Sequence, residues 1–144
     1  MVINTKTIQE FIKQQTEKYL HFDGLSFYWR FFGENFETRH SIEDYKHYHE
    51  NGHVKTMVNP KMVQAWADPH LPKTIHGCVR DEIGWVMSSP IGKHTSNDCY
   101  IKHIYCRSLE EWKEKMTRGS GDRVQRERKL EDWYEYNKRC NLEE

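Results

Sequence analysis

An aromatic run near the start of the chain, residues 25–32, most constrains what this sequence can fold into. It reads Leu-Ser-Phe-Tyr-Trp-Arg-Phe-Phe, and its polar and apolar residues alternate too weakly for a strand with one face in water. Aromatic side chains favour strands, so we expect a mostly buried strand that Gly33 ends. Apolar residues are only 36% of the chain but aromatic residues reach 13%, so the core must consist of a few large rings.

Helices are expected on both sides of this strand. Residues 5–20 carry apolar side chains at helical spacing behind a capping box, Thr7-Ile-Gln-Glu10. A second capping box, Ser108-Leu-Glu-Glu111, opens a helix that Gly119 ends. A highly charged helix is then expected from Asp122 onward.

The middle of the chain predicts short strands joined by loops. Its proline and glycine density favours loops between short strands, which we expect at residues 54–58, 75–79, 83–87 and 100–105. The polar, histidine-rich residues 34–52 predict a loop or a short helix opening at Ser41, and residues 61–67 one or two helical turns.

The order of these elements favours an α/β fold, with α+β as the alternative. A chain of 144 residues has room for about one domain, so residues 1–122 and the charged helix in 123–144 are assigned to the same domain.

Charge and apolar patterning limit the classes of partner. Lys+Arg and Asp+Glu both number 22, which argues against a chain-wide grip on nucleic acid or on an anionic membrane. The longest apolar stretches are far shorter than the ~20 residues that span a bilayer. The four cysteines include no Cys-x-x-Cys pair, and we interpret them as reduced thiols of a soluble, cytoplasmic protein.

Three places could carry chemistry. Cys99, His103 and Cys106, with His94 nearby, could suit zinc, but strand alternation would turn Cys106 away, which favours buried free thiols. Glu43 follows the aromatic strand in a loop where function concentrates, or it stabilises a first helical turn behind Ser41. The joint at 118–122, Arg-Gly-Ser-Gly-Asp, could hold phosphate or could be a plain turn between helices.

An ordered set of motifs extends over residues 5–122. The motifs are Gly24-Leu-Ser-Phe-Tyr-Trp-Arg-Phe-Phe-Gly33, His53-Val-Lys-Thr-Met-Val-Asn-Pro60, Asp68-Pro-His-Leu-Pro72, Ile101-Lys-His-Ile-Tyr105, Arg107-Ser-Leu-Glu-Glu-Trp112 and Arg118-Gly-Ser-Gly-Asp122. As an ordered set they resemble the C-terminal half of family-2-like glycosyltransferases with the GT-A fold, of the bacterial capsule or lipopolysaccharide type or the large-virus type.

The resemblance implies an inverting transfer of a sugar from a nucleotide-sugar donor to a glycan acceptor. Glu43 would be the general base, and His103 would stand where the family places a late metal ligand. The residues that would contact substrate are Trp29, stacking on a sugar ring, Arg30 and Gly33 on the acceptor side, and Arg118, Gly119 and Gly121 facing the diphosphate.

The family's Asp-x-Asp motif occurs nowhere in the 144 residues. The resemblance therefore implies a partial GT-A-like sheet with flanking helices and without the N-terminal nucleotide-binding half. Mn²⁺ or Mg²⁺ would be expected only together with that half, and no metal would be held tightly by this chain alone. Two explanations stay open: half of a transferase, completed by a partner chain or a second copy, or a non-catalytic carbohydrate-binding or protein-interaction module.

Overall fold

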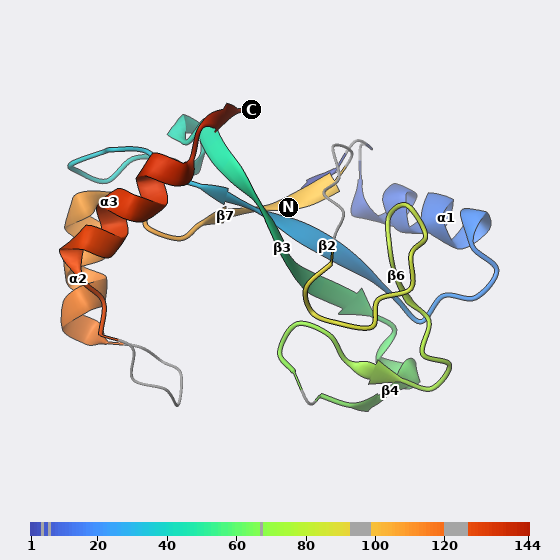
Figure 1. Ribbon diagram of the computed structural model, residues 1–144. Coiled ribbons are helices and arrows are strands. Elements are labelled where there is room, and N and C mark those ends of the chain that lie inside the picture. The colour runs from blue at the N-terminus through green and yellow to red at the C-terminus, as the bar shows by residue number, and fades with distance from the viewer. Residues whose placement is uncertain (4, 6, 67, 93–98, 120–126) are drawn as a thin grey trace. The chain divides into compact units, whose positions relative to one another are not determined.

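The computed structural model has a mixed α/β fold, which confirms the predicted class (Figure 1). It describes residues 1–3, 5, 7–66, 68–92, 99–119 and 127–144. These residues form two compact units. The first unit comprises Met1–Trp29 and Glu50–Lys102, and the second comprises Arg30–His49 and His103–Glu144.

The main sheet is mixed. Its strand order is β1-β7-β2-β3-β8, and β6 also pairs with β2. The β2–β6 pair is parallel, whereas β1–β7 and β3–β8 are antiparallel. The strands are β1 (Val2–Ile3), β2 (Gly24–Phe32), β3 (His47–Val58), β6 (Val79–Asp81), β7 (Cys99–Ile104) and β8 (Leu142–Glu143).

In the first unit, helix α1 (Ile8–Lys18) packs against the aromatic strand. The helix begins where expected, because the Thr7 hydroxyl accepts the Glu10 backbone N–H at 3.1 Å. Phe11 contributes to a buried cluster with Leu25 and Phe27 of β2 and Cys99 of β7. The prediction of a buried strand is confirmed, since seven of the nine residues of β2 are buried.

A second, small sheet of the first unit consists of β4 (Val63–Ala65) and β5 (Lys73–Thr74), and it corrects the expectation of helical turns over 61–67. Only the single 3-10 turn Pro60–Met62 is helical there, capped by the side chain of Asn59. The backbone N–H of Ile75 donates to Met62 at 2.9 Å and closes this small sheet.

In the second unit, α2 (Leu109–Arg118) and α3 (Leu130–Arg139) lie against each other (Figure 1). The predicted capping box at Ser108 and Glu111 is formed, and Gly119 ends α2 with a φ of 78°. Trp112 of α2 and Trp133 of α3 meet in a buried cluster with Cys106 and Leu109. Rings therefore form the core of this unit, as the composition predicted.

Further sequence-based expectations about elements hold only in part. The short helix expected to open at Ser41 is present as the 3-10 turn Ile42–Asp44, but strand β3 begins at His47, inside the residues expected to be a loop or a short helix, and pairs there with β8. Residues 75–79 contain only the start of β6, and residues 83–87 form no strand beyond a single bridge between Val86 and Arg80. Residues 127–129 are not helical, so α3 begins at Leu130, while Asp122 lies outside the described residues.

No helix among the described residues is both long and apolar enough to cross a membrane. All four cysteines are free thiols.

Candidate functional site

The first unit has an open groove of about 320 Å³ with mixed polar and apolar walls, which we call the Trp85 groove. Aromatic, aliphatic and hydroxyl-bearing side chains line it, together with one glycine: Tyr28, Trp85, Val86, Met87, Ser88, Ser89, Ile91 and Gly92. The groove falls in the size range of small-molecule sites, which is roughly 300–1,000 Å³.

A tight turn after β6 presents Trp85 to this groove. Gly84 has a φ of 98°, a conformation that side chains disfavour, and a Cβ there would lie 2.5 Å from the ring of Tyr19. The backbone of the turn is fixed at both ends, because Asp81 N–H donates to Trp85 O at 3.0 Å and Met87 N–H donates to Val79 O at 2.8 Å. Trp85 itself is 61% exposed.

A buried carboxylate forms the polar base of this turn. Asp81 is fully buried, and its two oxygens accept the Trp85 backbone N–H at 2.8 Å and the Tyr28 hydroxyl at 3.2 Å. Gly92 completes the wall, since a Cβ there would lie 2.2 Å from the Tyr28 hydroxyl oxygen. The backbone around the groove is thus held by hydrogen bonds of the Asp81 carboxylate and of the main chain.

Trp29, the residue expected to stack on a sugar, packs against protein rings in the first unit. His53 stacks on it with ring centres 5.5 Å apart, and the ring of His70 lies 5.1 Å away. The Lys55 ammonium group lies 5.7 Å from the centre of the indole. Its role in sugar binding stays a prediction.

A second polar pair in this unit joins Asp23 to His76. Nδ1 of His76 lies 2.9 Å from Asp23 Oδ1, and the backbone N–H groups of His76 and Cys78 donate to Oδ2 at 3.1 and 3.3 Å. Burial alone would raise the pKa of Asp23, but these hydrogen bonds outweigh it and lower the pKa to about 2. The ionised carboxylate holds the loop of His76 against the start of β2.

Arg30 and Gly33, expected on the acceptor side, belong to the second unit and serve its packing. The Arg30 side chain is buried, with its guanidinium carbon 4.6 Å from the centre of the Tyr48 ring. A Cβ at Gly33 would lie 2.3 Å from Asn137 Oδ1, so a larger residue there would force the Asn137 side chain to move. Contact with a glycan acceptor stays a prediction for both residues.

Glu43, the proposed general base, lies exposed in the 3-10 turn Ile42–Asp44 of the second unit. Its neighbour Asp44 is the residue that caps the turn, because the Ser41 backbone N–H donates to Asp44 Oδ2 at 2.9 Å. Both acids lie in the first turn, Asp44 makes its capping hydrogen bond, and the Glu43 side chain is exposed. The role of Glu43 as a base stays a prediction.

His103, the expected metal ligand, is half-buried near the end of β7. Its ring meets the edge of Phe31 with ring centres 4.7 Å apart, and Tyr105 lies 6.0 Å away. The described residues contain no group of three or more His, Cys, Asp or Glu side chains that could hold a metal ion. Its role as a ligand stays a prediction.

The phosphate site expected at 118–122 lies partly outside the described residues, and Gly121 is among those outside. Arg118 is exposed in the last turn of α2. The Gly119 backbone N–H donates to Lys115 O at 3.1 Å, so this amide closes the helix and is already paired. For Gly119, the plain helix-ending turn describes the structure.

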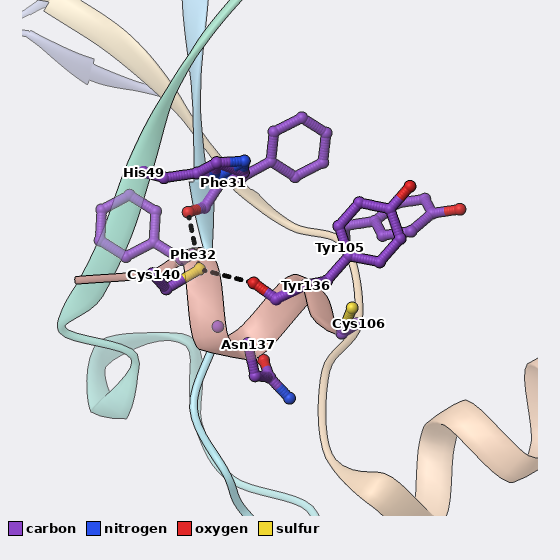
Figure 2. A pocket seen from close by; sticks show the side chains of 9 residues that line it. Phe31, Phe32, His49, Tyr105, Cys106, Tyr136, Asn137 and Cys140 are labelled. Atoms are coloured by element: carbon purple, nitrogen blue, oxygen red, sulfur yellow. Dashed lines mark hydrogen bonds between the residues drawn. The ribbon is translucent and has the colours of Figure 1, made fainter. Parts of the chain in front are cut away.

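The second unit also encloses a cavity of about 10 Å³, enough for one water molecule (Figure 2). Figure 2 shows the Cys140 thiol reaching the carbonyl oxygens of Phe31 and Tyr136, at 3.4 and 3.5 Å. Burial raises the pKa of Cys140 to about 11 and that of Cys106 to about 12. Both thiols keep their protons at neutral pH and are poor nucleophiles and metal ligands.

Comparisons with protein-family models, with curated proteins and with solved structures found no match for this chain.

The sequence analysis missed the residues that the structure brings together in the first unit: Tyr28, Asp81 and Trp85 at the groove, and His53 and His70 around Trp29. A local signal existed for the groove, because Asp81-Glu-Ile-Gly-Trp85 combines a side-chain acceptor with a glycine at turn spacing. No local signal pairs His53 with His70, since the rest of β3, the turn Pro60–Met62 and β4 lie between them in the sequence.

Proposed function

We propose that this chain binds a glycan in the Trp85 groove. One observation carries the proposal: an indole ring that is 61% exposed stands beside a groove of about 320 Å³ whose wall also carries hydroxyl groups. The flat apolar face of an indole suits the C–H side of a pyranose ring. The hydroxyls of Ser88 and Ser89 supply donors and acceptors for sugar hydroxyls.

The construction of the turn supports this assignment. Asp81 and Gly84 set the backbone of Trp85. A binding residue held by a rigid backbone loses little conformational freedom when the ligand arrives. The position of Trp85 is therefore fixed while more than half of its surface is accessible to a ligand.

Glycan binding at this groove fits both explanations left by the sequence. The chain would be the acceptor-side part of a GT-A-like, inverting glycosyltransferase, or a carbohydrate-binding module without chemistry. The first explanation adds sugar transfer to the proposal. Glu43 would then be the base, and a divalent metal would be supplied together with the nucleotide-binding half.

Two matched variants test the site. A panel of oligosaccharides is screened with the intact chain, and each binder is titrated by calorimetry. Trp85→Ala should weaken binding at least about tenfold, since it removes the stacking face. Trp66→Ala is the control, because Trp66 is also more than half exposed but lies outside the groove. Equal losses in both variants, or no binder in the panel, would contradict the proposal.

A second candidate function is protein interaction through the same surface. Ile83, Val86 and Ile91 are each about half exposed, which is a large apolar area for one loop region. Sedimentation over a range of concentrations tests whether a second copy is the partner. Concentration-dependent association that Ile91→Asp abolishes, without glycan binding, would favour this function over the first.

A further inference from the structure

Two histidines of the first unit lie beside Trp29, and their arrangement goes beyond the glycan site. The rings of His53, in β3, and His70, in the loop before β5, have centres 5.8 Å apart. Trp29 of β2 packs against both, at 5.5 and 5.1 Å. Each histidine is partly buried, so its ring has a defined position and still meets solvent.

The hydrogen bonds of His70 determine which ring nitrogen has a lone pair. Its Nδ1 lies 2.8 Å from the backbone carbonyl oxygen of Val54. A carbonyl oxygen only accepts, so Nδ1 carries the hydrogen. In the neutral ring the lone pair is then on Nε2.

The same reasoning applies to His53. Its backbone N–H donates to Asn51 Oδ1 at 2.9 Å, which identifies that atom of the amide as the acceptor oxygen. Nδ1 of His53 lies 2.7 Å from the same oxygen and must also donate to it. Both histidines therefore keep Nδ1–H on an oxygen and direct the basic lone pair to Nε2.

This pattern is the one that metal-binding histidines show. A ligating imidazole almost always donates its other N–H to a carbonyl or carboxylate oxygen, which fixes the tautomer and the ring orientation. The ring separation also fits, because two imidazoles sharing one Zn²⁺ at ~2.0–2.1 Å have centres roughly 5–6 Å apart. The observed 5.8 Å lies within this range.

The backbone holds the two rings in place before any ligand arrives. The His70 backbone N–H donates to Asp68 Oδ1 at 2.7 Å, and its carbonyl oxygen accepts the Thr56 hydroxyl at 2.7 Å. His53 lies in a strand and forms a bridge to Ile91. A site with prepositioned ligands needs little ordering on binding.

We propose that Nε2 of His53 and Nε2 of His70 bind one transition-metal cation of the class that prefers imidazole, namely Zn²⁺, Ni²⁺ or Cu²⁺. Two protein ligands leave the remaining coordination positions to water or to an added ligand. Lys55 opposes binding through its charge, since its ammonium group lies over Trp29 and donates to Pro69 O at 3.3 Å.

Calorimetric titration of the intact chain, without a histidine tag, with ZnCl₂ and NiCl₂ tests the proposal. We expect one ion per chain, and His53→Gln and His70→Gln should each bind at least about tenfold more weakly. His76→Gln is the matched control, because His76 also places Nδ1 on an oxygen, that of Asp23, but is 61% exposed and belongs to a different cluster. Lys55→Met should bind more tightly than the parent.

A measurement on the unchanged protein guards against variants that lose their fold. Long-range ¹H–¹⁵N spectra of the histidine rings should show Zn²⁺ shifting the Nε2 resonances of His53 and His70 together. A shift confined to other histidines, unchanged affinity in both His53→Gln and His70→Gln, or an equal loss in His76→Gln would overturn the proposal. Glycan binding at Trp85 is measured separately, so either proposal can fail alone.

Discussion

Two tryptophans of the second unit and two of the first have opposite environments. In the second unit Trp112 and Trp133 are each 1% exposed, and each indole N–H donates to a backbone carbonyl oxygen, at 3.0 and 3.1 Å. In the first unit Trp66 and Trp85 are more than half exposed. The same residue type is thus buried in the core of one unit and, at these two positions of the other, more than half exposed.

The difference arises from what holds each backbone. Trp112 and Trp133 lie on α2 and α3, and the burial of their rings in one cluster holds the two helices together. The turn of Trp85 is held by the carboxylate of Asp81 and by Gly84 instead. Removing a ring should therefore affect stability in one unit and binding in the other.

The largest expected effect is that of Trp133→Ala. It removes a fully buried ring and the hydrogen bond that the indole N–H donates to Arg107 O. The free energy of unfolding should fall by about 3–5 kcal/mol. Trp85→Ala should change it by no more than about 0.5 kcal/mol, since the ring is largely exposed. Urea unfolding followed by far-UV circular dichroism measures both. Similar losses would show that the exposed ring also stabilises the fold.

The next effect concerns the buried charge of the first unit. Both carboxylate oxygens of Asp23 accept hydrogen bonds. Asp23→Asn replaces one oxygen with an NH₂ group, which then faces a donor instead of accepting from it. It should cost about 1–3 kcal/mol at neutral pH. The measurement is the unfolding free energy of parent and variant at pH 7, with Glu10→Gln, an exposed acid of α1, as the control.

The pH dependence of this effect has a defined sign. Because the folded pKa of Asp23 is lowered from 3.8 to about 2, its stabilisation is complete above about pH 4 and disappears as the pH falls toward 2. Asp23→Asn should remove that part of the acid loss. An unchanged acid profile would mean that other carboxylates govern it.

The smallest effect belongs to the second unit and lies in a different pH window. His47 Nδ1 is 2.8 Å from Glu34 Oε1, and this hydrogen bond and the carboxylate charge raise the pKa of His47. A raised folded pKa gives stabilisation that is complete below 6.5 and is lost as the pH rises through the folded value. His47→Gln should flatten the stability profile above pH 6.5. A profile that keeps its slope would assign the loss to another group.

Elements with strong local signals were predicted correctly. The hydroxyl of Thr7 and the capping box of Ser108 define the starts of α1 and α2, and Gly119 defines the end of α2. The aromatic content of residues 25–32 predicted β2 because burial on both faces favours large rings. These signals act within one turn or one strand, so the sequence contains all of them.

Elements that depend on distant partners were missed. The first half of β3 has polar side chains with no alternation, and it becomes a strand because His47 and Tyr48 pair with Glu143 and Leu142. Residues 83–87 look like an apolar strand, but the Asp81 carboxylate captures the Trp85 amide and turns the chain. In both cases hydrogen bonds decide the structure, and a pattern of hydrophobic residues does not predict them.

The candidate sites follow the same rule. The expected roles of Trp29, Glu43 and His103 came from a resemblance over residues 5–122, whereas the contacts that define the groove and the histidine pair are tertiary. His53 and His70 meet only because β3 and the loop before β5 are adjacent, as the Val54 carbonyl bound by His70 shows. The sequence shows that such histidines are present, but it does not predict which two of them lie side by side.

Hydrogen exchange of the buried indole N–H groups of Trp112 and Trp133 reports local opening of the second unit. Each proton is bonded to a carbonyl just outside a helix, Lys129 O or Arg107 O. Neither proton can exchange with solvent deuterium until the helix pair opens locally. Their exchange rates therefore measure the opening of α2 and α3 directly.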